Sequence, residues 1–61
     1  MTKQQAIDYI KQNREKTFLV RPVTFHKFGI YEIAGVNRAE IIIQDVTRAE
    51  ANAILYEAMR H

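Results

Sequence analysis

The chain contains no cysteine, so neither a disulfide nor a thiolate zinc site can stabilise its fold. The two histidines, His26 and His61, have no companions at metal-ligand spacing, and we expect no metal, cofactor or small-molecule substrate. No apolar run approaches the roughly 20 residues needed to cross a bilayer, and the N-terminus predicts a polar helix rather than a signal peptide. These absences favour a cytoplasmic protein.

Groups that would support catalysis are also missing. The two glycines, Gly29 and Gly35, are isolated, so no phosphate-binding loop is expected. The carboxylates occur singly among polar neighbours, which is typical of solvated surface charges, and they form no catalytic pair. They are Asp8, Glu15, Glu32, Glu40, Asp45, Glu50 and Glu57. The sequence therefore predicts a protein that is not an enzyme.

The composition is that of a small folded domain. The 61 residues are 48% hydrophobic and 26% charged, which predicts a single domain over residues 1–61. The formal charge of +2 comes from residues of both signs interspersed along the chain. A domain of this size buries only about 60% of the surface that its unfolded chain exposes, so a partner or self-association would add stability.

Two capping boxes predict where helices begin. Thr2 is followed three residues later by Gln5, and Thr47 is followed at the same spacing by Glu50. In each pair the hydroxyl accepts a backbone N–H of the first turn, while the longer side chain accepts the N–H of the capping residue. The first helix is expected to end within Asn13–Lys16 and the second to run from Arg48 to about Arg60.

The first strand is expected over residues 17–25, where β-branched and aromatic residues become frequent. Its apolar residues change parity at Arg21–Pro22. Proline in a sheet is confined to edges and bulges, so a bulge is expected there, in an irregular edge strand. Such a bulge would place four apolar side chains on one face: Phe18, Val20, Val23 and Phe25.

Short connections join this strand to two others. Residues 26–29 are expected to form a four-residue hairpin connection into a strand over residues 30–34. Gly29 would permit a positive φ angle in it. A turn over residues 35–38 leads to a strand over residues 39–44. The predicted fold is α+β: an α-β-β-β-α order with a three-stranded antiparallel meander and two helices packed on one face.

Alternation with a period of two assigns residues to the two faces of this sheet. The predicted helix-side core is Ala6, Ile7, Ile10, Phe18, Val20, Val23, Phe25, Tyr31, Ile33, Ile41, Ile43, Ala51, Ile54, Leu55 and Ala58. The opposite face then carries an apolar centre with a polar rim, the arrangement of a binding patch. The predicted partner-binding residues are Leu19, Arg21, Ile30, Glu32, Glu40, Ile42 and Gln44. Helices on both faces would instead bury the same residues as ordinary core.

The segment His26–Lys27–Phe28 has two interpretations. It is either a turn whose Phe28 packs back over the core, or a basic, aromatic hairpin tip that recognises a partner.

In element order, size and the histidine of its first hairpin, the chain resembles the double-stranded-RNA-binding domain. That family reads the minor groove with its first helix and first hairpin, and contacts phosphates through lysines at the start of its last helix. Here the corresponding stretch, residues 45–51, has one arginine between acidic residues. The resemblance therefore implies weak nucleic-acid binding. Of the residues that would bind nucleic acid, only His26 is carried over from the resemblance. Lys27, Arg38 and Arg48 are added as cations near loops and the start of the last helix.

The first hypothesis is thus a small non-enzymatic accessory or regulatory module that binds a protein partner through the open face of its sheet, with self-association through the same face. A bacterial or phage accessory protein would suit this description. A weak nucleic-acid-binding module is the alternative.

Overall fold

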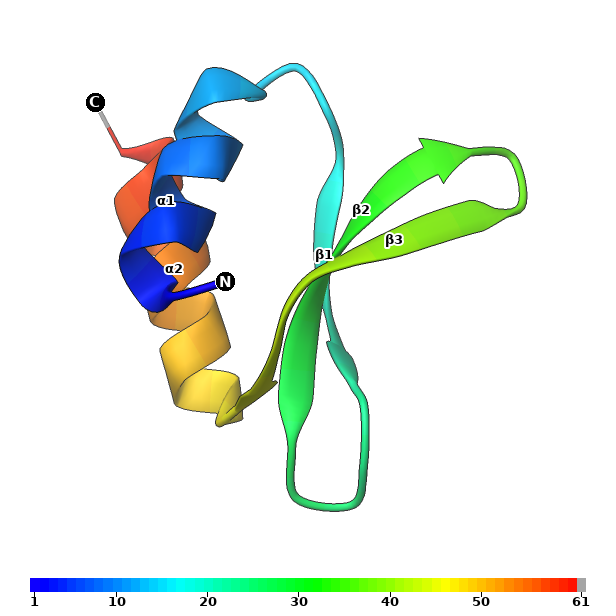
Figure 1. Cartoon of the computed structure of the whole chain (residues 1–61), viewed down its shortest axis with the longest axis vertical. Coiled ribbons are helices and arrows are strands. Elements are labelled where there is room, and N and C mark those ends of the chain that lie inside the picture. Colours follow the sequence, from blue (N-terminus) through cyan, green and yellow to red (C-terminus); the bar gives the residue numbers. More distant parts are fainter. Residues whose placement is uncertain (61) are drawn as a thin grey trace.

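The computed structural model describes residues 1–60 (Figure 1), so His61, to which we assigned no metal role, lies outside the described residues. The strands form one antiparallel sheet in the order β1-β2-β3. The predicted α+β fold and its element order are confirmed. The elements are α1 (Lys3–Gln12), β1 (Phe18–Pro22), β2 (Phe28–Gly35), β3 (Arg38–Val46) and α2 (Arg48–Met59).

Both helices begin at the predicted capping boxes. The backbone N–H of Gln5 donates to Thr2 Oγ1 and the Thr2 N–H donates to Gln5 Oε1, at 3.1 and 2.8 Å. Thr47 and Glu50 repeat the arrangement at 3.0 and 3.1 Å. In each box, the side chain of either residue accepts the backbone N–H of the other, which fixes the first turn of the helix.

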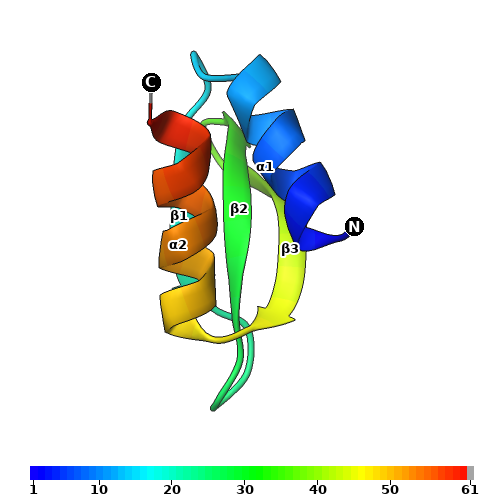
Figure 2. The ribbon, with the colours of Figure 1, turned by 90° about the vertical axis from the view of Figure 1, so that its left-hand side faces the viewer.

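The two helices lie side by side on one face of the sheet, as predicted (Figure 2). Helix α1 contacts β3 and, through Tyr9, Glu32 of β2, whereas α2 contacts β1 and β2. Near the C-terminal ends of both helices, the Arg14 guanidinium donates to the carbonyl oxygens of Ala58 and Arg60, at 3.3 and 2.9 Å. This bridge joins the chain segment after α1 to the C-terminal end of α2.

The core lies between the helix layer and the sheet. Ile10 and Ile30 are its largest fully buried side chains. Its buried apolar residues are Ala6, Ile10, Ile30, Ile43, Val46, Ala51, Ile54 and Ala58, with Ile7, Tyr9, Phe18, Val20, Ile42 and Leu55 packed against them. Ten of the predicted core residues are in these two groups: Ala6, Ile7, Ile10, Phe18, Val20, Ile43, Ala51, Ile54, Leu55 and Ala58.

Strand β1 is shorter and more regular than predicted. It ends at Pro22 and pairs with β2 without a bulge. The N–H groups of Val23 and Thr24 both donate to the Lys27 carbonyl oxygen, at 2.8 and 3.1 Å, so the connection begins earlier than residue 26. The core assignment of Phe25 was therefore wrong: its side chain is 90% exposed at the hairpin tip, edge-on to His26.

The face assignment of β2 was reversed. Val20 pairs with Ile30, and Phe18 pairs with Glu32. Because directly opposed residues of antiparallel strands share a face, Ile30 and Glu32 point to the helices and are buried. The expectation that they lie on the open face was wrong, and so was the helix-side assignment of the residues that alternate with them, Tyr31 and Ile33.

Strand β3 changes face at an irregularity. Ile43 pairs with Ile30 on the helix side, but Ile41 pairs with Tyr31, so Ile42 is an extra residue between them. Such a bulge shifts the alternation by one residue. As a result Ile41 is on the open face, where it was not predicted, whereas Ile42 packs against the core.

Glu50, the capping carboxylate of α2, makes the stability of the protein depend on pH. The Lys3 ammonium pairs with Glu50, and the Thr47 N–H and hydroxyl add to this in holding the pKa of Glu50 down, from its ordinary value of 4.5 to about 2. A lowered folded-state pKa contributes stability above about pH 4.5, and this contribution is lost as the pH falls toward 2.

We expect the melting temperature to fall between pH 4.5 and 2, and Glu50→Gln to make this decline shallower. Glutamine keeps an oxygen for the capping hydrogen bond and removes only the charge. Glu15 is exposed and forms no ion pair within residues 1–60, so Glu15→Gln is the matched control. The melting temperatures are measured by circular dichroism as the pH is lowered. The same decline in Glu50→Gln and Glu15→Gln would contradict the role of Glu50.

Candidate protein-binding face

The surface of the sheet opposite the helices, here called the open face, is lined by apolar side chains and one arginine. Leu19 pairs with Tyr31, and Tyr31 pairs with Ile41, so these three residues form a row across all three strands. Leu19 and Ile41 are 43% and 42% exposed, and Tyr31 is half-buried. The middle of the open face is therefore an apolar strip that no element of the described chain covers.

Two further apolar residues extend this strip. Ile33, half-buried, follows Tyr31 at the next position of the same face. At the other end, a Cβ placed on Gly29 would lie 3.0 Å from Val23 Cγ2 and 3.4 Å from Ile41 Cδ1. The side chains of Val23 and Ile41 thus approach each other over the glycine, and they keep the surface apolar where β2 has no side chain.

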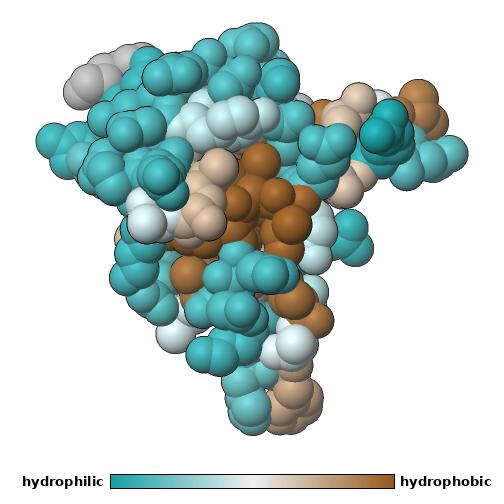
Figure 3. All heavy atoms as spheres, in the orientation of Figure 1, coloured by the Kyte–Doolittle hydropathy of each residue, from teal (hydrophilic) through white to brown (hydrophobic). Residues whose placement is uncertain are grey.

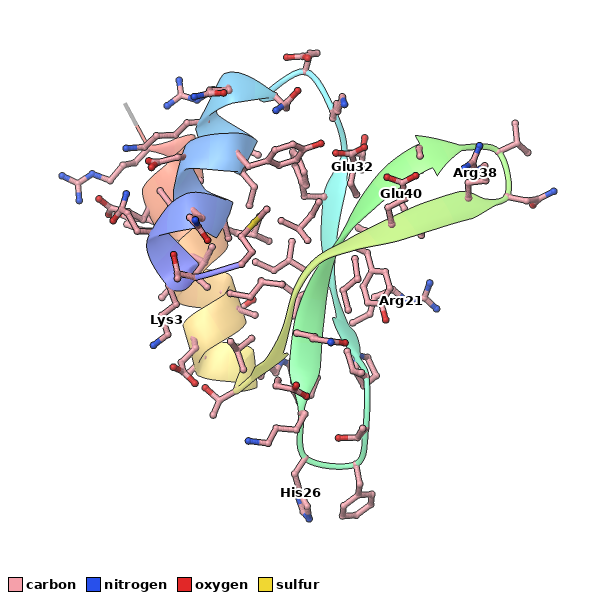
Figure 4. The ribbon with its side chains drawn as sticks, in the orientation of Figure 1. Lys3, Arg21, His26, Glu32, Arg38 and Glu40 are labelled. Carbon is pink, nitrogen blue, oxygen red and sulfur yellow. The ribbon has the colours of Figure 1, made fainter. Side chains whose placement is uncertain are left out.

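Figure 3 views the sheet from its β3 edge and shows hydrophobic residues gathered in the middle of the molecule, next to hydrophilic residues of the helix layer. Figure 4 shows Arg21 projecting from the sheet on the side away from the helices. Its guanidinium forms no ion pair within residues 1–60. Tyrosine and arginine are among the residues that most often supply binding energy at protein interfaces, so the open face has the composition of a binding site.

On the helix side, Glu32 is held inside the fold. Tyr9 donates its hydroxyl to the Glu32 carboxylate, and Lys16 Nζ lies 3.6 Å from the other carboxylate oxygen. The hydrogen bond to Glu32 raises the pKa of the Tyr9 hydroxyl, and the Glu32 charge raises the pKa of Lys16. A buried carboxylate with two polar partners is a structural group, so Glu32 has no free oxygen pointing toward a partner at the open face.

Of the seven predicted partner-binding residues, the structure places Leu19 and Arg21 on the open face. Gln44 is exposed in the irregular stretch of β3 that faces Gly29. Glu40 pairs with Glu32 and so shares the helix-side face, where it lies 3.7 Å from Arg38. Its assignment to the open face, like those of Ile30, Glu32 and Ile42, was therefore wrong.

Three apolar residues of the open face were predicted to lie in the sheet, but on its helix side. Tyr31 and Ile33 were assigned to the helix side, with the charged Glu32 between them expected in solvent. Ile41 was assigned there with Ile43 because no bulge at Ile42 was expected. Ile30 and Glu32 lie two positions apart, so they share a face of the strand. Placing Ile30 in the core would have predicted the open-face position of Tyr31 and Ile33, if Glu32 had been expected to find polar partners in α1 and the segment after it.

The cations of the nucleic-acid alternative do not gather on one surface. In Figure 4, His26 lies at the end of the β1–β2 hairpin, and Arg38 lies at the end of the β2–β3 hairpin, which points elsewhere. Arg48 is exposed in the first turn of α2, and Lys27 is in the first hairpin. A phosphate backbone needs several cations along one track. Nucleic-acid binding stays a prediction without a described site.

A groove of about 320 Å³ lies between the two helices, lined by Lys3, Ile7, Glu50, Ala53, Ile54 and Glu57. The Lys3–Glu50 pair and the Glu57–Arg60 pair use the charged groups of this lining. Within residues 1–60, no buried side-chain polar atom lacks a hydrogen-bond partner. The groove therefore presents no unpaired polar group that would orient a ligand.

Residues 1–60 do not bring three or more His, Asp or Glu side chains together in a way that could hold a metal ion. None of the described helices is long and apolar enough to cross a membrane. In comparisons with known proteins, no family model, no characterised protein and no solved structure matches the chain.

Proposed function

We propose that this protein is a small, non-enzymatic accessory or regulatory module of the cytoplasm, which acts by binding a protein through the open face of its sheet. The observation that supports this most is the row Leu19–Tyr31–Ile41, which crosses the sheet on the side without helices. Burying such a strip removes apolar surface from water, worth about 25 cal/mol per Å² before the costs of association.

The placement of charge adds specificity to this surface. Arg21 stands beside the apolar row and is free of ion pairs within the described chain. An arginine next to a tyrosine and two aliphatic side chains offers directional hydrogen bonds around an apolar centre. A partner would therefore present an apolar surface flanked by an acceptor, and a carboxylate satisfies the guanidinium best.

Replacing Ile41 by lysine is expected to abolish capture of the protein partner, because it puts a charge in the middle of the apolar row. The measurement is a pull-down from lysate, with and without nuclease. Val36 is fully exposed at the β2–β3 hairpin tip, so Val36→Lys makes the same chemical change outside the row and should leave capture intact.

Capture that survives nuclease and is lost only in Ile41→Lys supports the proposal. Capture that disappears with nuclease would favour the nucleic-acid alternative. Equal capture by Ile41→Lys and Val36→Lys, with both variants folded, would exclude the open face as the binding surface.

A further inference from the structure

Arg21 of β1 and Asp45 of β3, two charges of opposite sign, lie on either side of the same residue of β2. Residues that face one another across the three strands in this way are here called a level of the sheet. Arg21 pairs with Gly29. On the other side of β2, Phe28 pairs with Val46 and Ile30 with Ile43, so Gly29 faces the stretch Gln44–Asp45 of β3. Gln44 and Asp45 are exposed, and neither Arg21 nor Asp45 forms an ion pair within residues 1–60.

The apolar row lies one level further along the strands. Here Leu19 on β1 and Ile41 on β3 flank Tyr31 on β2. In the apolar row, both outer strands therefore carry an aliphatic side chain. In the level beside it, β1 carries a basic residue and β3 an acidic one. A surface with this property is complementary to itself after a half-turn about an axis that runs along β2.

We propose that the open face binds a second copy of this chain, with the two sheets face to face and a twofold axis parallel to β2. The half-turn sets β1 of one copy over β3 of the other. It brings Leu19 onto the partner's Ile41, Tyr31 onto the partner's Tyr31, and Arg21 onto the partner's Gln44–Asp45. Every contact occurs twice, as in any isologous interface.

Charge distinguishes this arrangement from other face-to-face arrangements. An axis perpendicular to the strands would set β1 over the partner's β1, so each Arg21 would lack an acidic counterpart from β3. With the axis along β2, the two guanidinium groups lie on opposite edges of the interface and each meets an acidic segment. Complementary charge at the rim of an apolar centre fixes the register of such an interface.

The available area allows at most a weak dimer. Figure 2 looks through the helix layer at the sheet, and the extents of the molecule along the two axes of this view are 31 and 16 Å. These extents bound the face at roughly 500 Å², so two copies would bury at most about 1,000 Å², the lower limit of specific interfaces. The dimer is therefore expected to dissociate in the micromolar range or above.

This inference rests on the proposed function, because it assigns a partner to the same face. The test is sedimentation equilibrium of the parent chain, of Arg21→Asp, of Asp45→Lys, and of an equimolar mixture of the two variants, up to about 1 mM. The parent should show a concentration-dependent dimer. Each variant alone should associate at least about tenfold more weakly, since like charges then meet twice. The mixture should recover the dimer, because each variant supplies the charge that the other lacks.

Asp45 has a left-handed backbone, φ 62°, so lysine there adds strain, and thermal melting must show that the variant is folded. If Asp45→Lys is unfolded, Gln44→Lys at the same level takes its place. Recovery in the mixture supports the twofold arrangement, whereas a dimer without recovery overturns it. A parent that stays monomeric at the highest concentration also overturns the inference, while the Ile41-dependent capture described above would still support the proposed function.

Discussion

Replacing Ile30 by alanine is expected to unfold the protein or nearly so. Ile30 is fully buried at the middle of the central strand, and it pairs with Val20 on one side and Ile43 on the other. Truncating a buried isoleucine typically costs about 2–5 kcal/mol, because apolar contacts are lost and a cavity remains. A domain of this size has a total stability at the low end of about 5–15 kcal/mol, so the loss takes most of it.

The matched control for this experiment is Ile33→Ala in the same strand. Ile33 lies on the open face and is only half-buried, so the same truncation should cost much less. Urea denaturation of the two variants therefore tests the orientation of β2. A larger loss of stability in Ile33→Ala than in Ile30→Ala would mean that the strand presents its other face to the helices.

Replacing Gly29 by alanine is expected to destabilise the protein by about 1–3 kcal/mol, the usual cost of overpacking. A Cβ at this position would lie only 2.7 Å from the backbone carbonyl oxygen of Ile43. A backbone oxygen within a sheet cannot rotate away, so β2 and β3 would have to separate where the register is already irregular. Gly29 thus permits close approach of two strands; it was predicted to serve a hairpin turn.

Gly35 provides the comparison for this second variant. A Cβ on Gly35 would meet nothing within 4 Å, and its φ is not positive. Gly35→Ala should therefore be neutral or stabilise the fold by up to about 1 kcal/mol, since alanine restricts the unfolded chain. If both variants have the same urea midpoint, the close approach at Gly29 does not limit the fold.

Local signals in the sequence were enough to predict the element order and the helix starts. A capping box is complete within four residues, so Thr2–Gln5 and Thr47–Glu50 could be recognised without knowing the rest of the fold. The antiparallel meander followed from short connections, since neighbouring strands joined by tight turns pair with each other.

The faces of β2 and β3 could not be predicted, because they depend on distant residues. Glu32 is tolerated inside because Tyr9, 23 positions earlier, donates a hydrogen bond to it and Lys16 lies beside it. A strand-level rule that expects glutamate in solvent therefore assigned the wrong parity. The extra residue Ile42 lies in a run of three isoleucines, where no change of residue type marks a bulge.

The side-by-side helices give the order in which this chain can complete its core during synthesis. The meander can pair as soon as β3 has emerged, but α2 must follow before β1 and β2 are covered, and Arg14 reaches the Arg60 carbonyl across 46 positions. Until then the nascent sheet exposes apolar side chains on both faces, one lined by Ile30 and the other by Tyr31. A chain truncated before α2 should therefore aggregate, because α1 alone leaves much of the helix side of β1 and β2 uncovered.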